Sequence, residues 1–266
     1  MAKVTLLVDT SKCTACRGCQ IACKQWWDLA ASKTTQTGSY ENPRDLAPNT
    51  LTRITFSEYE SGGKMQWLFL NLGCMHCTNA ACVDVCPTGA LKHNEMGFVS
   101  FEREVCNGCG YCAQACPFGI PRMDTTDLLT GDAKASKCTL CQDRVTNGMT
   151  PACVKGCPSR ALQFGDRTAM LGIARQRVDA LKARGYAQAS IYGENELGGL
   201  GRVYVLTAPA PAYGLPESPE YPALATLWQS VVQPFGYIAG GLMVVGLGVN
   251  WFLTRRARLS TVERDN

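Results

Sequence analysis

The sequence has little net charge and lacks the short motifs that mark most catalytic and nucleotide-binding sites. Its 26 Lys and Arg residues nearly balance 22 Asp and Glu residues, leaving a net charge of +4. A charge this small and dispersed argues against a nucleic-acid partner. The chain contains no phosphate loop, no dinucleotide fingerprint and no Ser-His-Asp arrangement. We therefore expect no catalytic residues and no substrate site of its own, so the chain is not expected to be an enzyme by itself.

We also expect no N-terminal secretory signal. The run Met1–Val8 is too short for an apolar signal core before it meets Asp9. We therefore expect the 16 cysteines to enter the fold as reduced thiols that are available for metal, rather than as disulfides.

Cysteine is what the sequence has in abundance, and it occurs in four tight quartets. Three cysteines at short steps can wrap one face of a cubane cluster. The fourth, often followed by proline, is expected to start a helix leading away and to ligate a neighbouring cluster. The quartets are Cys13, Cys16, Cys19 and Cys23; Cys74, Cys77, Cys82 and Cys86; Cys106, Cys109, Cys112 and Cys116; and Cys138, Cys141, Cys153 and Cys157.

Structural zinc is the main alternative metal, because Cys-x2-Cys pairs serve both zinc and iron. Zinc sites rarely use four cysteines in one run at this spacing, so the quartets predict [4Fe–4S] clusters. A scaffold of disulfide bonds is a weaker alternative than zinc, because disulfides within Cys-x2-Cys pairs would close short, strained loops. Spacing alone leaves open which quartets pair, and Lys24 departs from the ferredoxin pattern by replacing the proline after Cys23.

The remaining patterns predict a few regular elements and one long apolar segment. Val231–Leu253 carries no charge and would span roughly 35 Å as a helix, against about 30 Å of bilayer hydrocarbon. A buried core helix is the alternative, but core helices seldom run this long without charge. Strands are expected at Lys3–Val8, Arg53–Phe56, Gln66–Asn71, Phe98–Phe101 and Arg202–Thr207, and an amphipathic helix at Thr168–Arg184.

The fold class is therefore predicted to be α+β. It combines two ferredoxin-like modules that hold four [4Fe–4S] clusters with a helical extension and one C-terminal transmembrane helix. The four-cluster domain is expected at 1–165 and a helix, strand and proline-rich linker at 166–222. The membrane helix is expected at 223–254 and a tail at 255–266.

Several stretches resemble a known family. Asp9–Trp26 resembles the iron–sulfur subunit of molybdopterin oxidoreductases. Gly38–Leu46, Gly73–Cys77 and Lys182–Tyr186 look like the beta subunit of membrane-bound respiratory formate dehydrogenase. The likeness covers nearly the whole chain. It implies a subunit that passes electrons from a molybdenum or tungsten pterin catalytic alpha subunit to a cytochrome b gamma subunit in the lipid bilayer, which reduces quinone.

The resemblance also implies a nested pairing of the quartets, the first with the fourth and the second with the third. The implied ligand sets are Cys13, Cys16, Cys19 and Cys157 for cluster 1; Cys23, Cys138, Cys141 and Cys153 for cluster 2; Cys74, Cys77, Cys82 and Cys116 for cluster 3; and Cys86, Cys106, Cys109 and Cys112 for cluster 4. The first module would face the catalytic subunit and the second the membrane.

Charges beside the apolar segment predict its orientation. Arg255, Arg256 and Arg258 follow it, whereas Glu217 and Glu220 precede it. Flanks rich in Lys and Arg stay in the cytoplasm. We therefore expect a single-pass protein of the bacterial inner membrane with its C-terminus in the cytoplasm and its clusters on the periplasmic side. The alternative is that these arginines only anchor the helix end.

Other residues near the quartets are expected to support the clusters without binding iron. His76 is expected to hydrogen-bond or pack beside a cluster, and His93 to lie on the surface. The cations Lys12, Lys24, Lys137 and Arg144 flank ligands and could offset cluster charge. Three other functions stay open: the same role in a hydrogenase or another molybdopterin oxidoreductase, a zinc-binding interaction module, and a soluble electron carrier.

Overall fold

The first strand of the chain lies inside the main sheet. A computed structural model describes residues 3–36, 38–124 and 133–262. β1 (Val4–Asp9) pairs in antiparallel fashion with β8 (Leu162–Asp166) and in parallel with β10 (Arg202–Leu206). β9 (Ser190–Tyr192) completes the sheet beyond β10. The sheet thus unites the N-terminal strand with the region expected to be a separate extension.

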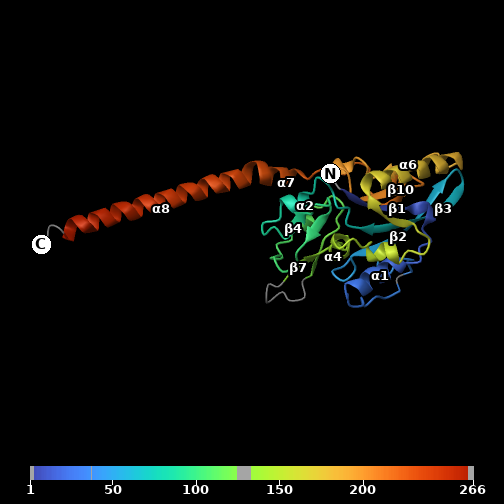
Figure 1. The fold of residues 1–266 in the computed structure, drawn as a ribbon, viewed down its shortest axis with the longest axis horizontal. Helices are drawn as coiled ribbons and strands as arrows, with labels where there is room; N and C mark the ends of the chain where they lie inside the picture. Colours follow the sequence, from blue (N-terminus) through green and yellow to red (C-terminus); the bar gives the residue numbers. More distant parts are fainter. Residues whose placement is uncertain (1–2, 37, 125–132, 263–266) are drawn as a thin grey trace. The chain divides into compact units, whose positions relative to one another are not determined.

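Helix α6 (Arg167–Ala183) covers one face of this sheet (Figure 1). The predicted helix is confirmed, and the Asp166 side chain caps it by accepting a hydrogen bond from the Ala169 amide at 3.0 Å. Its apolar stripe packs on every second residue of the strands, because successive strand side chains point to opposite faces of a sheet. The buried residues of this interface include Ala174, Val178, Leu181, Leu7, Val203 and Val205.

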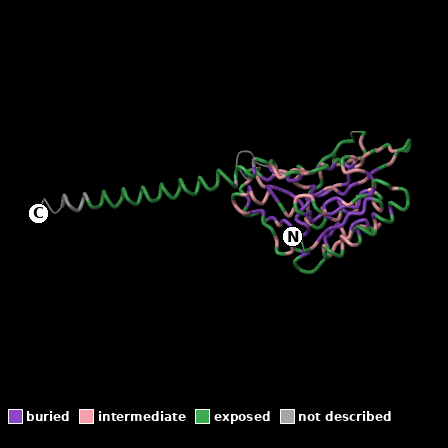
Figure 2. Tube along the Cα trace, turned by 90° about the horizontal axis from the view of Figure 1, so that it is seen from above, coloured by how far each residue is buried: buried purple, intermediate pink, exposed green. Residues whose placement is uncertain are grey.

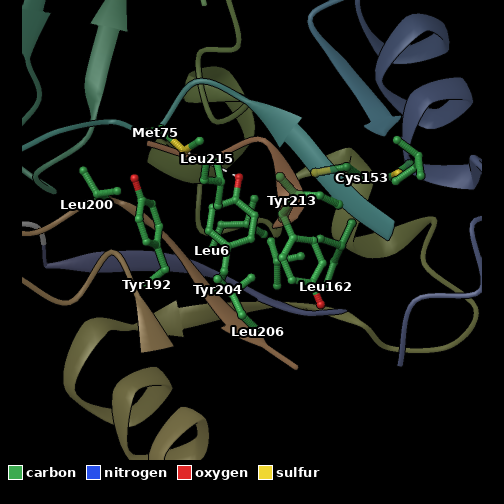
Figure 3. Close-up of a cluster of buried hydrophobic side chains, with 14 of the residues drawn as sticks. Leu6, Met75, Cys153, Leu162, Tyr192, Leu200, Tyr204, Leu206, Tyr213 and Leu215 are labelled. Carbon is green, nitrogen blue, oxygen red and sulfur yellow. Dashed lines mark hydrogen bonds between the residues drawn. The ribbon is translucent and has the colours of Figure 1, made fainter. Parts of the chain in front are cut away.

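The opposite face of the sheet packs against a long hairpin, β2 (Thr52–Ser61) and β3 (Lys64–Gly73). Both predicted strands are confirmed and run further than expected. Gly62 and Gly63 adopt φ values of 59° and 71°, which close a tight turn and let pairing continue to Ser61. The largest core of the chain fills this space, with Tyr204 and Met75 near its centre (Figure 3).

Short elements carry the cysteine-rich segments. β4 (Leu91–His93) pairs with β5 (Val99–Phe101), and β6 (Arg122–Asp124) pairs with β7 (Lys134–Ser136). Both pairs are antiparallel. The helices here are α1 (Gly18–Trp26), α2 (Ala81–Asp84), α3 (Tyr111–Gln114), α4 (Gln142–Thr146) and α5 (Ala152–Lys155).

The chain divides into two compact units, residues 1–222 and 223–266. The second unit consists of α7 (Ala223–Leu227), a π-helical turn at Trp228–Val232 and α8 (Gln233–Val262). Within it, Ala225–Arg256 is long and apolar enough to cross a membrane, and its most apolar stretch is not buried in this chain (Figure 2). It is therefore not a core helix of this chain. The side chain of Arg258 and residues 263–266 of the predicted tail lie outside the described residues.

Candidate functional site

All four quartets begin with the same backbone turn. The residue just before the second cysteine adopts a left-handed conformation in every quartet, although only one of the four is glycine. Side chains seldom adopt this conformation unless the surrounding structure requires it. The four residues are Ala15, His76, Gly108 and Leu140, with φ values of 53°, 50°, 72° and 57°. The repeat therefore extends from sequence spacing to backbone geometry.

The helices hold the third cysteine rather than starting at the fourth. α2, α3 and α5 each carry the third cysteine of a quartet and end before the fourth. The prediction that the fourth cysteine starts a helix is wrong for these three quartets, because the following proline disfavours helical geometry in the preceding residue. In the first quartet Lys24 replaces proline, and α1 continues through Cys19 and Cys23 to Trp26.

The nested quartets meet through a close approach of α1 and α5. A Cβ added to Gly18 would lie 2.9 Å from the Gly156 carbonyl oxygen. A Cβ added to Gly156 would lie 2.8 Å from the Ala22 Cβ. Both distances are too short for a side chain, so glycine is needed at each position. This contact brings two cysteines of the first quartet, Cys19 and Cys23, close to two cysteines of the fourth, Cys153 and Cys157.

The thiols gather in four groups, each drawing three cysteines from one quartet and one from its nested partner. Two groups line openings, and the members of the other two lie within electrostatic range of one another. The groups are Cys13, Cys16, Cys19 and Cys157; Cys23, Cys138, Cys141 and Cys153; Cys74, Cys77, Cys82 and Cys116; and Cys86, Cys106, Cys109 and Cys112. Each has the membership of one ligand set that the resemblance implies.

The donor set fits iron–sulfur clusters. Within the described residues, no three Cys, His, Asp or Glu side chains converge closely enough to share a single metal ion. In a cubane each cysteine binds a different iron atom, so its four thiols stand further apart than around one zinc. Backbone N–H groups of Gly108, Leu140 and Ala152 also point at cysteine sulfurs, over 3.4, 3.4 and 3.5 Å. Such donors stabilise the anionic sulfur of a bound cluster.

Burial raises the pKa of several of these thiols above its ordinary value. Burial raises the pKa of Cys19 to about 12, against a hydrogen bond from Asn71 that lowers it. Burial likewise raises the pKa of Cys141 to about 11. Since the thiolate is the ligand, binding iron in these pockets must release protons.

Shared buried cores connect the four groups, and the core of the first two groups is also packed against by Cys77 of the third. Cys19 and Cys153, from the first and second groups, share one buried core. Cys23 of the second group shares another core with Cys74 of the third. A third core contains Cys112 of the fourth group and is packed against by Cys82 of the third. Of the sixteen cysteines only Cys16 and Cys109 are exposed, one in the first group and one in the fourth.

His76 lies fully buried between two cysteines of the second quartet. Its Nδ1 accepts a hydrogen bond from the Val99 amide at 3.2 Å. Burial, and then the charges of Lys137 and Arg202, hold the pKa of His76 well below its usual range. The ring is therefore neutral and carries its proton on Nε2, which has no hydrogen-bond partner. His76 offers a donor rather than a fifth metal ligand.

The four flanking cations differ in their surroundings. Lys137 is buried and its Nζ donates to the carbonyls of Val99 and Cys138, at 2.9 and 3.1 Å. Arg144 is buried as well, and its guanidinium lies 4.2 Å from the ring centre of Trp26. Lys12 pairs with Asp9, and Lys24 donates to two backbone carbonyls. His93 is exposed, as predicted.

Sequence reasoning missed two buried polar residues between the pockets, Asn71 and Arg202. Asn71 donates from Nδ2 to the Cys19 sulfur at 3.2 Å. Arg202 is fully buried and lies 3.7 Å from the Cys138 sulfur through Nη2. A charged residue at the head of the apolar run Val203–Leu206 was the available signal, because arginine is almost never fully buried without a partner.

Comparison with protein families gives two overlapping matches. Two family models, each described as a 4Fe–4S dicluster domain, match residues 12–90 and 65–167. Together they span all four quartets.

Comparison with characterised proteins gives matches along nearly the whole chain. The iron–sulfur subunit of the nitrate-inducible formate dehydrogenase of Escherichia coli is 42% identical over 94% of this chain and 87% of its own length. The formate dehydrogenase-O iron–sulfur subunit of the same organism is 39% identical over 93% and 85%. A formate dehydrogenase iron–sulfur subunit of Haemophilus influenzae is 41% identical over 90% and 77%.

Proposed function

This chain belongs to the family of formate dehydrogenase iron–sulfur subunits and carries electrons within such a complex, and we propose that it does so through four [4Fe–4S] clusters in series. The observation that carries this proposal is that all sixteen cysteines gather in four separate four-thiol groups. A cluster, when bound, accepts and releases one electron at a time. The protein holds each cluster by four thiolates, buries it and supplies N–H donors to its sulfur atoms.

Each thiol group would hold one cluster. The first module contains the first and fourth quartets and the second module contains the second and third. The proposed ligands are Cys13, Cys16, Cys19 and Cys157 for cluster 1; Cys23, Cys138, Cys141 and Cys153 for cluster 2; Cys74, Cys77, Cys82 and Cys116 for cluster 3; and Cys86, Cys106, Cys109 and Cys112 for cluster 4.

Electrons would enter at cluster 1 and leave at cluster 4. Exposure of Cys16 in the first group and of Cys109 in the fourth supports these two groups as the points where electrons enter and leave the chain. The exposed aromatic side chains of Tyr40 and Trp67 pack together near Arg17, the residue that follows Cys16. Exposed aromatic residues are enriched at protein interfaces. A molybdopterin catalytic subunit would dock there, and a cytochrome b subunit that reduces quinone would receive electrons at the other end.

The C-terminal helix would anchor the protein in the membrane. We propose that 1–165 form the four-cluster domain, 166–222 an extension on the same sheet, 223–254 the membrane span and 255–266 a cytoplasmic tail. Arg255 and Arg256 at the end of the apolar window support a cytoplasmic C-terminus. The clusters would then face the periplasm of the bacterial inner membrane.

Isolation of the native complex tests this function. Formate added anaerobically is expected to bleach the brown clusters and to reduce added quinone. If hydrogen, or the substrate of another molybdopterin enzyme, reduced the clusters and formate did not, the chain would carry electrons in a different complex. Colourless protein containing zinc would instead favour a structural interaction module.

A further inference from the structure

Arg202 is a buried cation without a carboxylate. Its side chain is 0% exposed, and none of the salt bridges between described residues includes it. Its Nη1 donates to the side-chain and main-chain oxygens of Asn71, at 2.9 and 3.1 Å, and its Nε has no partner. Burying a charge without a counter-charge is strongly unfavourable. The molecule must therefore supply negative charge beside Arg202 from another source.

The nearest sources of negative charge are cluster ligands. Arg202 Nη2 lies 3.7 Å from the Cys138 sulfur, in the second thiol group. Tyr204, and then Cys153 and Cys74 of the second and third groups, also lie within electrostatic range of Arg202. The guanidinium therefore stands at the junction of two pockets. A cubane with four thiolate ligands is an anion, so the loaded pockets supply the missing counter-charge.

Asn71 extends this arrangement to the first group. It accepts from Arg202 through Oδ1 and donates through Nδ2 to the Cys19 sulfur at 3.2 Å. Because Asn71 is 2% exposed and Arg202 fully buried, water does not screen this path. One hydrogen-bonded path thus runs from a ligand of cluster 1, through Asn71 and Arg202, to a ligand of cluster 2.

The local structure makes room for the guanidinium. A Cβ at Gly73 would meet both Nη1 and Nη2 of Arg202 at 2.8 Å. Tyr204, on the same face of β10, donates its hydroxyl to the Asn71 carbonyl at 3.0 Å and lies beside Met75 (Figure 3). These contacts hold Asn71 and Arg202 in one arrangement.

We propose that Asn71 and Arg202 form a buried cationic bridge that raises the reduction potentials of clusters 1, 2 and 3 relative to cluster 4. Added negative charge on a reduced cluster is stabilised by a nearby cation and by hydrogen bonds to sulfur. The bridge touches or faces ligands of the first three groups and none of the fourth. This contribution favours reduction of the first three clusters over reduction of cluster 4. This inference depends on the proposed function, because it requires clusters in the pockets.

Redox titration of the purified complex, followed by electron paramagnetic resonance, tests the bridge. Arg202→Met removes the charge at similar side-chain length and is expected to lower the midpoint potentials of clusters 1 to 3, most for cluster 2. Cluster 4 serves as the internal reference and is expected to stay unchanged. Arg175→Met is the matched control, because Arg175 is an exposed cation of the same unit that pairs with Glu194; it is expected to change no potential.

Two further variants keep the test decisive if Arg202→Met assembles poorly. Arg202→Lys keeps the charge and is expected to give potentials between those of wild type and Arg202→Met. Asn71→Leu removes the donor to Cys19 together with the side-chain acceptor of Arg202, and it is expected to lower the midpoint potential of cluster 1 most. Unchanged potentials in Arg202→Met with full iron content, or in Asn71→Leu, would overturn the bridge. Wild-type protein without four clusters would instead overturn the proposed function.

Discussion

At the scale of single residues, the local backbone positions the cysteines of each quartet. The left-handed residue before each second cysteine turns the loop, and backbone amides then point at sulfur, as Leu140 does toward Cys138 at 3.4 Å. Such strained positions persist only where the surrounding structure requires them. The pockets are therefore pre-organised for a bulky, anionic group.

The crossed ligands give a sharp residue-scale prediction. Cys23→Ala is expected to destroy the cluster of Cys138, Cys141 and Cys153, because Cys23 lies with that group. The other three clusters are expected to remain, so about four irons per chain are lost. Iron analysis and electron paramagnetic resonance of the purified complex measure this.

The reciprocal variant Cys157→Ala is the matched control. It is expected to remove the cluster of Cys13, Cys16 and Cys19 instead, with the same loss of iron. If both variants removed the same cluster, or if Cys23→Ala removed the cluster of its own quartet, the nested pairing would be wrong.

Residue identity was predictable from sequence where spacing carries the information. The sixteen cysteines are evident because their steps match a cubane. Asn71 and Arg202 were not found, because they belong to different strands far apart in the chain. Their role depends on the packing of the β2–β3 hairpin against the sheet that contains β10, which no local pattern contains.

At the scale of elements, the contact between α1 and α5 decides whether quartets one and four can meet. Gly18 and Gly156 allow the two helices to touch backbone to backbone. Since α1 carries Cys19 and Cys23, and α5 carries Cys153, a shift of this contact would misplace ligands of two clusters at once.

Gly156→Ala tests the role of this contact. The new methyl would lie 2.8 Å from the Ala22 Cβ, so the helices must separate. We expect the free energy of unfolding to fall by about 1–3 kcal/mol. Lower thermal stability and lower iron content in the first module are expected. Gly172→Ala is the control, because a Cβ added at this position in α6 would meet open space. The change is expected to raise the free energy of unfolding by about 0.5–1 kcal/mol. Equal effects of the two variants would refute the packing role.

Elements with a long, regular pattern were predictable, and short ones were not. The amphipathic stripe of α6 and both strands of the β2–β3 hairpin were confirmed. The four-residue helices α2, α3 and α5 were placed one cysteine too late, because a single turn of helix has no periodicity to detect. Their position is set by the third cysteine and the proline that follows the fourth.

At the scale of the whole molecule, the chain combines a cysteine-rich unit with an apolar helix. The most apolar stretch of the helix Ala225–Arg256 is exposed, and the helix span ends at two arginines. Exposed apolar surface of this extent requires a lipid or protein environment. A membrane span meets that requirement, and the arginines then favour the cytoplasmic side for the C-terminus.

A reporter fused after Asn266 tests this orientation. A fluorescent protein that matures only in the cytoplasm is expected to glow there, and a phosphatase active only in the periplasm is expected to stay inactive. The same two reporters inserted in the linker at Pro219 provide the control, for which the opposite pair of results is expected. Phosphatase activity after Asn266 would place the clusters in the cytoplasm.

The central claim is that this chain holds four [4Fe–4S] clusters, and iron and acid-labile sulfide in anaerobically purified native complex test it most directly. Sixteen cysteines in four groups predict about sixteen irons and an equal amount of sulfide per chain, beyond those of the partner subunits. Stoichiometric zinc, or iron without matching sulfide, would contradict it.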